Sequence, residues 1–369
     1  MSRQRILHVI WTARTGGIAS VVLQLLENGQ SRRELEDLEP AIMMGKKTGD
    51  MLPEFLSSGV AVYDAGLKGG MDLRPAAYKR CKAIFDSFDI LHFHSFNPLM
   101  ALAACNSKAK TVYTEHGNFG LGRRPQAADM LIRFLQKRFL NRCVKAVTFN
   151  SGFTQRLSIS RFGLERPLKR MIPNGIRPLK PNRDAGSQFK AMKSDGILIA
   201  SIGRLAAVKR FDRLIDAFSA ASPGNSRLVI LGSGPEKRNL LSMIAASNMT
   251  DRISIVEKGN VHDLLATCDY CVLPSSGEAF GLVVLEAYQH GKKVLVFPDG
   301  GGARELVEEV EPDAVVADVA ELSEKILQYD KRKISVENDG QRKEMRKRHA
   351  QKYSIDRMHD AFNELYSEI

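Results

Sequence analysis

The chain has 369 residues, of which 44% are hydrophobic and 26% charged; this ordinary globular composition excludes a disordered protein, and the length calls for two domains. The formal net charge is +12, and the excess lies in residues 1–180, which contain 28 Lys and Arg against 14 Asp and Glu, whereas residues 181–369 contain 26 against 28. A basic first half attracts an anionic partner, whether nucleic acid, an acidic lipid surface or a phosphorylated substrate, but solubility alone accounts for it equally well.

The first predicted element is a buried strand at residues 6–10. The basic start MSRQR gives it a superficial likeness to a signal sequence, but the apolar run carries His8 and lacks a small-residue cleavage site, so we expect a cytoplasmic protein. Gly16, Gly17 and Ile18 follow, just before the helical pattern ASVVLQLLE. Two glycines at a helix start let backbone amides approach a phosphate, although a tight turn without a ligand has the same pattern.

Short apolar runs alternate with amphipathic stretches along both halves, which predicts parallel sheets flanked by helices. The expected strands are residues 6–10, 41–44, 90–94, 111–114, 146–149, 197–202, 227–231, 252–256, 270–273 and 293–297. We therefore predict an α/β fold of two Rossmann-like, doubly wound domains, at residues 1–178 and 195–345. Residues 179–194 are rich in proline and turn residues and form the expected linker, and residues 346–369 are expected to be helices that pack back toward the first domain.

Histidines mark the ends of two strands in the first half. His92 and His94 share one face of the strand at residues 90–94, and because no third ligand is evident we expect packing rather than metal binding. His116 follows the next strand in the polar sequence Tyr-Thr-Glu-His-Gly-Asn. This position suits a site residue, and it equally suits a histidine at the edge of the core.

Residues 129–145 are predicted to form a basic amphipathic helix. Its apolar stripe is Leu131, Leu135, Phe139 and Cys143, and its cations are Arg133, Lys137, Arg138, Arg142 and Lys145. Arg123 and Arg124 precede this helix, and a second basic cluster consists of Lys79, Arg80 and Lys82. Such a helix suits the face of an anionic bilayer, where each cation contributes about 1 kcal/mol, or it packs its stripe on its own sheet.

The five cysteines fit reduced, mostly buried thiols better than a disulfide framework. They are Cys81, Cys105, Cys143, Cys268 and Cys271. The last two form a Cys-x-x-Cys pair inside the apolar run LLATCDYCVLP, with no second pair nearby. We therefore interpret them as core residues rather than zinc ligands.

Two cations follow the first strand of the second half. Arg204 comes directly after Gly203 at the strand end, and Lys209 stands five residues further on. Arginine can bind two oxygens and lysine supplies a point charge, so the pair predicts a clamp for a diphosphate. The later turn Gly-Ser-Gly-Pro at residues 232–235 lacks the third glycine of a dinucleotide fingerprint, which argues against a dehydrogenase.

Two carboxylates follow the strand at residues 270–273. Glu278 lies in the loop, and Glu286 lies about two turns into the next helix, inside the apolar run LVVLEAY. A buried carboxylate needs hydrogen-bond donors, which sugar or ribose hydroxyls supply; an arginine from elsewhere in the fold is the alternative partner of Glu286. The helix start offers unpaired backbone amides to phosphate.

Together these segments resemble the family-4 glycosyltransferases, also called glycosyl transferases group 1, of the GT-B fold. The matching pieces are TGGIASVVLQL, VYTEHGN, IPNGI, IGRLAAVKRFDRLIDAF, LVILGSGP, LPSSGEAFGLVVLEA and GKKVLVFPDGGGARELV, in the family's order and over most of the chain. The resemblance implies two domains facing each other across a cleft. It further implies a nucleotide-sugar donor of the UDP or GDP type, retention of configuration, and no cofactor or metal.

The resemblance also implies a role for each matching residue. The transferred sugar is expected to face His116 and to be bound through its hydroxyls by Glu278, and the diphosphate is held by Arg204 and Lys209. Backbone amides that approach the donor are implied at Gly16, Gly17, Ile18, Phe280, Gly281, Leu282 and Val283. Glu286 is implied to bind the ribose, and residues 257–260 to lie near the nucleobase.

The sequence departs from the family pattern at Arg210, where glycine is common, and at residues 257–259, which puts base recognition in doubt. The acceptor is expected to be a saccharide or a lipid-linked saccharide in bacterial cell-surface polysaccharide or lipopolysaccharide synthesis, with the protein peripheral at the inner face of the cytoplasmic membrane. A nucleotide-sugar epimerase or a soluble-acceptor synthase of the same fold is the alternative. A non-enzymatic protein that binds anionic polymers is a distant one, and nucleic acid is not an expected partner because basic and aromatic residues do not interleave.

Overall fold

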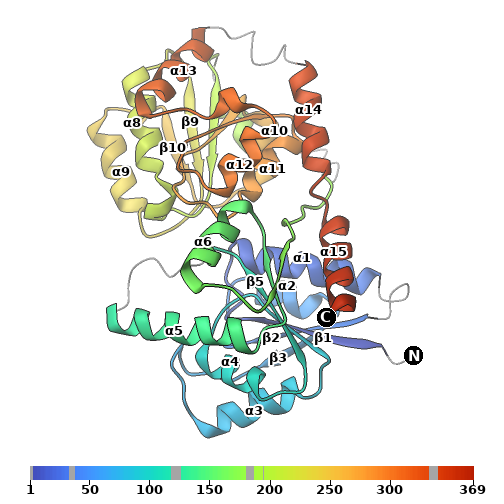
Figure 1. The fold of residues 1–369 in the computed structure, drawn as a ribbon. Helices are drawn as coiled ribbons and strands as arrows, with labels where there is room; N and C mark the ends of the chain where they lie inside the picture. Colours follow the sequence, from blue (N-terminus) through green and yellow to red (C-terminus); the bar gives the residue numbers. More distant parts are fainter. Residues whose placement is uncertain (1–2, 33–37, 118–125, 180–186, 194, 332–339) are drawn as a thin grey trace. The chain divides into compact units, whose positions relative to one another are not determined.

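The computed structural model describes residues 3–32, 38–117, 126–179, 187–193, 195–331 and 340–369. It divides into two compact units (Figure 1): unit 1 is Met1–Arg177 together with Ile355–Ile369, and unit 2 is Pro178–Ser354. Each unit holds one parallel sheet with helices around it, which confirms the predicted pair of α/β domains. Among the described residues, no helix is both long enough and apolar enough to cross a membrane.

Unit 1 contains a seven-stranded sheet in the order β3-β2-β1-β4-β5-β6-β7. Its strands are β1 (Gln4–Ile10), β2 (Leu38–Met44), β3 (Ala61–Asp64), β4 (Ile90–Phe93), β5 (Lys110–Glu115), β6 (Ala146–Phe149) and β7 (Leu168–Met171). The apolar runs predicted all of these except β3 and β7. Those two are the edges of the sheet, and none of their residues is fully buried, so neither carries an apolar run.

Helices cover both faces of this sheet. They are α1 (Gly17–Ser31), α2 (Leu52–Ser57), α3 (Pro75–Phe85), α4 (Pro98–Cys105), α5 (Gln126–Arg142), α6 (Gly152–Phe162) and α15 (Ile355–Glu368). The last helix of the chain therefore completes the first unit: α15 packs beside α1 and buries Phe362 and Tyr366.

Unit 2 contains a five-stranded sheet in the order β10-β9-β8-β11-β12. Its strands are β8 (Leu198–Ile202), β9 (Arg227–Leu231), β10 (Ile253–Val256), β11 (Tyr270–Leu273) and β12 (Lys293–Val296), each within a residue or so of its predicted place. Its helices are α7 (Ser187–Lys190), α8 (Phe211–Ala221), α9 (Lys237–Ala246), α10 (Val261–Thr267), α11 (Leu282–Gln289), α12 (Gly302–Glu308), α13 (Val319–Lys331) and α14 (Gly340–Gln351), with short 3-10 helices η1 (Ala207–Lys209) and η2 (Pro312–Ala314).

Two segments between and after the sheets differ from their predicted form. Part of the expected linker, residues 187–190, is the short helix α7, which packs on α10 because Phe189 is fully buried there. The terminal helices begin at Gly340 rather than at residue 346, and they belong to different units: α14 is part of unit 2 and α15 part of unit 1.

The strand order of both sheets reverses at one point, between β1 and β4 in unit 1 and between β8 and β11 in unit 2. In open parallel sheets, ligands bind beyond the carboxyl ends of the strands at such a switch point. The loops that follow these four strands are therefore the places in each unit where a site is expected.

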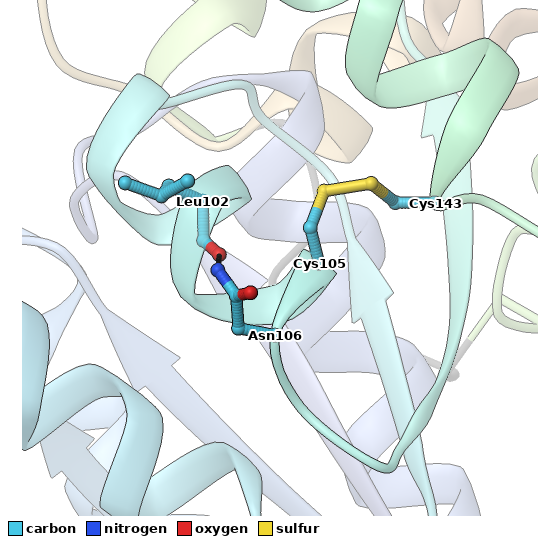
Figure 2. The surroundings of a disulfide bond; sticks show 4 residues. All are labelled: Leu102, Cys105, Asn106 and Cys143. Carbon is cyan, nitrogen blue, oxygen red and sulfur yellow. Dashed lines mark hydrogen bonds between the residues drawn. A yellow bond between two sulfur atoms is a disulfide. The ribbon is translucent and has the colours of Figure 1, made fainter.

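The prediction of five reduced thiols was wrong for one pair. Cys105, at the end of α4, and Cys143, just beyond α5, form a disulfide with their Cα atoms 5.2 Å apart (Figure 2). The two residues are 38 positions apart in sequence, and only the packing of α4 against α5 brings them together. Cys81, Cys268 and Cys271 are free and buried, as expected of core residues.

Candidate active site

The loop after β8 brings the two predicted clamp cations together. Lys209 lies in η1, and its side chain folds back over Gly203: a Cβ atom on that glycine would lie 3.4 Å from the Lys209 Cε. Arg204, the neighbour of this glycine, is exposed, and its guanidinium has no hydrogen-bond or ion-pair partner within the described part of the chain. Both positive groups therefore gather at the carboxyl end of β8, at the switch point of unit 2.

Glu278 joins these cations from the loop after β11, where its carboxylate forms an ion pair with the Lys209 ammonium. Backbone contacts hold this loop: the Gly302 amide donates to the Glu278 carbonyl at 2.7 Å, and the Ser276 amide donates to the Val208 carbonyl at 2.8 Å. The second bond ties the loop directly to η1. The pair is consequently positioned by main chain on both sides.

The start of α11 presents backbone amides beside this pair. Gly281 has φ 98°, a left-handed conformation, and a Cβ atom there would lie 2.8 Å from the Cβ of Ala303, so both backbone and packing require glycine. No side chain of the described residues caps α11, and its first turn contains no acidic residue. The Leu282 and Val283 amides have no intrahelical partner, while Phe280 anchors the preceding loop in the core.

Glu286 lies one turn further along α11 and is half-buried. Burial raises the pKa of its carboxyl from an ordinary 4.5 to about 7. The described residues provide neither an arginine nor any other hydrogen-bond or salt-bridge partner for it, so the alternative of a structural ion pair finds no support there. A half-buried carboxylate that receives no hydrogen bond from the protein is suited to accept hydrogen bonds from the hydroxyl groups of a ligand.

The start of α1 is a second uncapped helix end. Gly16 is its N-cap with extended backbone, Gly17 is its first residue, and no side chain caps it. A Cβ atom on Gly17 would meet no atom of the described residues within 4 Å, so packing among them does not explain the glycine. The Thr15 amide donates to Asp50 at 2.7 Å, which fixes the loop while the amides at Gly17 and Ile18 stay at the open helix end.

His116 lies just beyond β5 and lines a cavity of about 650 Å³ within unit 1. Burial lowers the pKa of His116 to about 4, so the ring is neutral at physiological pH. The cavity wall combines aromatic and polar side chains, among them Trp11, Phe96, Tyr113, Gln136 and Arg133. A cavity of this size and lining is typical of a small-ligand site, and aromatic side chains with hydrogen-bonding groups suit a saccharide.

A third histidine, His8, lies beside His92 and His94. The sequence alone did not predict this cluster. His8 of β1 pairs in register with His92 of β4, and one ring nitrogen from each of the three lies within 4.8 Å of the others. This is the group of described residues that could hold a metal ion. The signal was a histidine inside the apolar run of each strand, but only the β1–β4 pairing shows that the two strands lie side by side. Both ring nitrogens of His92 already have partners, Tyr366 and Thr114, each at 2.6 Å.

The basic helix α5 packs differently from the predicted stripe. Phe139 is buried, as expected, but Leu131 is 48% exposed, and Met130 and Phe134 are exposed beside it at 69% and 55%. The helix ends at Arg142, so Cys143 is not part of it. Lys137, Arg138 and Arg142 are exposed. Arg123 and Arg124 lie outside the described residues.

Comparison with known proteins finds a matching family model for each of the two units. Residues 15–178 match the family model for Glycosyltransferase Family 4, and residues 182–360 match that for Glycosyl transferases group 1. An uncharacterized glycosyltransferase of Haemophilus influenzae is 28% identical over 216 residues, 57% of each chain. The N-acetyl-alpha-D-glucosaminyl L-malate synthase of Bacillus anthracis is 34% identical over 106 residues, 28% of each. The chain thus matches only part of the length of these curated relatives.

Solved structures agree on the fold. The Anabaena protein HepE, in complex with UDP and glucose, has a TM-score of 0.80 at 18% identity and covers 99% of this chain and 100% of its own. A sucrose-phosphate synthase from Thermosynechococcus elongatus has a TM-score of 0.77 at 18% identity, with 99% of each chain covered. At such identities the likeness shows the fold alone.

Proposed function

Because this chain belongs to the family-4 glycosyltransferases and has their GT-B fold, we propose that it transfers a hexose-type sugar from a UDP or GDP sugar to a saccharide or a lipid-linked saccharide. The observation that carries the proposal is the group at the switch point of unit 2. There, neighbouring loops hold a lysine–glutamate pair, together with an arginine and a helix start that have no side-chain partner among the described residues.

The proposed chemistry is stabilisation of a leaving diphosphate by fixed charges. Arg204 binds phosphate oxygens through its fork of donors, and Lys209 adds a point charge. The amides of Leu282 and Val283 donate to the same group at the positive end of α11. Preorganised donors of this kind stabilise charge as it develops in the transition state. We therefore propose that turnover needs no metal and that configuration is retained by a front-face departure of the nucleotide.

We further propose that the Lys209–Glu278 ion pair rearranges when the donor binds. A diphosphate attracts the ammonium more strongly than one carboxylate does, so binding of the donor shares or breaks the pair. The Glu278 carboxylate is then able to accept hydrogen bonds from sugar hydroxyls. In the free protein the pair holds both groups in place, which lowers the entropy lost when the donor binds.

We assign the acceptor to the cavity beside His116, and His116 itself to the transferred sugar and the leaving oxygen, as the family resemblance implies. Met130, Leu131 and Phe134 are exposed next to the cations of α5. Exposed apolar side chains beside basic ones suit the surface of an anionic membrane. We therefore propose that the acceptor is membrane-borne, in the synthesis of a bacterial cell-surface polysaccharide at the inner face of the cytoplasmic membrane.

The site assignment is tested by turnover with a panel of UDP and GDP sugars and saccharide acceptors. Arg204→Ala and Lys209→Ala are each expected to lower kcat about 100-fold or more, as the loss of one transition-state donor does in other enzymes. Lys347→Ala is the matched control, because Lys347 also pairs with a glutamate in unit 2, at 2.8 Å, but on the exposed helix α14. Unchanged rates in both clamp variants would contradict the assignment.

The membrane assignment is tested by flotation with vesicles that contain or lack anionic lipid. We expect co-flotation with anionic vesicles, weakened by high salt and by Phe134→Ser, since screening and loss of apolar area each reduce the attraction. Leu241→Ser, which removes a similarly exposed apolar side chain from α9 of unit 2, is the control. Equal binding to neutral and anionic vesicles would contradict a role for the cations.

A further inference from the structure

A row of polar side chains crosses one face of the sheet of unit 1 in the interior of the domain. It includes His8 on β1, His92 on β4 and Thr114 on β5, with His94 and His116 just beyond the strand ends. His8, His92 and His94 are fully buried, and α15 covers the row. Buried polar groups are costly unless each has a partner, so the partners of these rings decide what the row does.

Three of the rings form one continuous chain of hydrogen bonds. The Nδ1 atom of His8 lies 2.9 Å from the Nε2 atom of His94, and the Nδ1 atom of His94 lies 3.0 Å from the Nε2 atom of His116. The chain therefore leads from the interior of the sheet to the histidine that lines the large cavity. It uses Nε2 of His116, and since Nδ1 has no hydrogen-bond partner within the described part of the chain, Nδ1 is the ring nitrogen available to a ligand.

The protonation state of this chain is fixed by burial. Burial lowers the pKa of His8 to about 3 and holds the pKa of His94 well below its usual range, and the neighbouring rings lower that of His94 further. All three imidazoles are consequently neutral, with one N–H donor and one acceptor each. Two arrangements then satisfy both hydrogen bonds: every ring carries its proton on Nδ1, or every ring carries it on Nε2.

His92 stands beside this chain without belonging to it. Its two nitrogens bind the Tyr366 hydroxyl and the Thr114 hydroxyl, and Thr114 in turn lies 2.6 Å from the Thr148 hydroxyl. The rings of His92 and His94 have centroids 4.1 Å apart. His92 is thus held from both sides and limits rotation of the His94 ring.

At the far end, His8 borders a cavity of about 20 Å³ that is also lined by His359 and Tyr366 of α15. This is room for about one water molecule, which can donate to or accept from the outer nitrogen of His8. Either arrangement of the chain is therefore possible at this end. The choice between them is left to the ligand at His116.

We propose that His94 and His8 are positioning residues that fix the ring orientation of His116 and couple its tautomer to their own. This rests on the proposed function in one respect: a sugar or phosphate oxygen is an acceptor and selects the arrangement in which His116 donates from Nδ1. All three rings then carry Nδ1–H. Without the chain, the His116 ring is free to rotate and its tautomer is no longer coupled to the inner rings, so only part of the molecules can donate to the ligand.

A metal ion bound by His8, His92 and His94 is the competing explanation of the cluster. It would need lone pairs that are already used, since both nitrogens of His92 have partners and the His8–His94 contact is itself a hydrogen bond. The hydrogen-bonded chain accounts for the inner nitrogens of the cluster without an ion.

The test is long-range nitrogen–proton NMR of the full chain labelled with 15N-histidine, recorded with and without UDP. In the wild type with UDP, we expect His8, His94 and His116 each to show a single Nδ1–H tautomer. His94→Phe keeps a ring but removes both hydrogen bonds, and His116 is then expected to show a mixture of tautomers. His92→Phe, two residues before His94 and outside the chain, keeps a ring beside His94; it is the matched control and should leave the His116 tautomer unchanged.

Enzyme kinetics supply a second readout. In His94→Phe we expect kcat to fall about 10- to 100-fold with the donor KM within about threefold, since misorientation of a reacting group acts on turnover. Mixed or opposite tautomers among the three wild-type rings would overturn the proposal, and this needs no variant. One equivalent of zinc retained by the wild type but not by His94→Phe would overturn it as well. Absence of transferase activity with intact tautomer coupling would instead count against the proposed function alone.

Discussion

Glu286 offers the sharpest test because its effect on stability has a predictable sign. The pKa of this carboxyl is about 7 in the folded protein against an ordinary 4.5, so the unfolded chain ionises first. The penalty is absent below about pH 4.5, grows between 4.5 and 7, and is complete above 7. A shift from 4.5 to about 7 corresponds to at most about 3 kcal/mol, and the remaining solvent contact of the half-buried side chain reduces this to about 1–2 kcal/mol.

Glu286→Gln removes the charge and keeps the shape. We therefore expect the variant to be more stable than the wild type by about 1–2 kcal/mol at pH 8 and equally stable at pH 4.5. Urea denaturation monitored by circular dichroism at both pH values measures the difference. Glu308→Gln, on an exposed part of α12, is the control and should show no such dependence on pH. A gain in stability that is the same at both pH values would refute the reasoning.

The same carboxyl links nucleotide binding to proton release. Because burial raises the pKa of Glu286 to about 7, a fraction of the wild-type molecules carries this carboxyl protonated at neutral pH, and hydroxyl groups that donate to the carboxylate favour its ionised form. Binding of the matching nucleotide is therefore expected to release a fraction of a proton, measured by calorimetry in buffers of different ionisation enthalpy. Glu286→Gln should release none and bind more weakly. Equal release in both proteins would show that the proton comes from another group.

Three further predictions concern stability. Gly281→Ala is expected to cost about 2–3 kcal/mol and to lower the melting temperature, because it combines a positive φ with a Cβ contact of 2.8 Å. Cys105→Ser should destabilise by up to about 4 kcal/mol in urea without reductant and by nearly nothing with reductant, since opening the link to Cys143 frees a long loop. Arg210→Gly should be more stable than Arg210→Ala by about 1 kcal/mol in thermal melts: both lose the ion pair to Asp212, but only glycine relieves the left-handed backbone at φ 48°.

The interior of the fold was predictable from the sequence, and its edges were not. Central parallel strands such as β4 and β11 are buried on both faces and therefore appear as uninterrupted apolar runs. The edge strands β3 and β7 have sequences AVYD and LKRM, which lack such a run because solvent reaches them. Helix α7 was missed for a similar reason: one buried side chain, Phe189, holds it, and four residues carry no periodicity.

In the candidate site, too, the sequence indicated which residues take part but not which of them contact one another. Charged residues and glycines that follow a strand can be recognised from the sequence alone, and for this reason the sequence predicted Arg204, Lys209 and Glu278 as site residues. That the last two form an ion pair is a contact over 69 positions, and the chain from His8 to His116 spans three strands. Such pairs depend on strand order, which the sequence left open. The Cys105–Cys143 disulfide escaped prediction for the same reason.

The candidate donor residues share a property that packing alone does not favour. Within the described residues, Arg204 lacks a protein partner and neither α1 nor α11 has a side-chain cap. Ionisation of Glu286 destabilises the folded state. Local stability would favour a partner, a neutral side chain and a serine or aspartate cap at these positions. Under the proposed function, a diphosphate nucleotide would satisfy the arginine and the α11 amides, and its ribose would satisfy the carboxylate. A ligand that does so stabilises the folded state by about 2.7 kcal/mol at a concentration 100 times its Kd. The melting temperature should therefore rise with the matching nucleotide in the wild type and much less in Arg204→Ala.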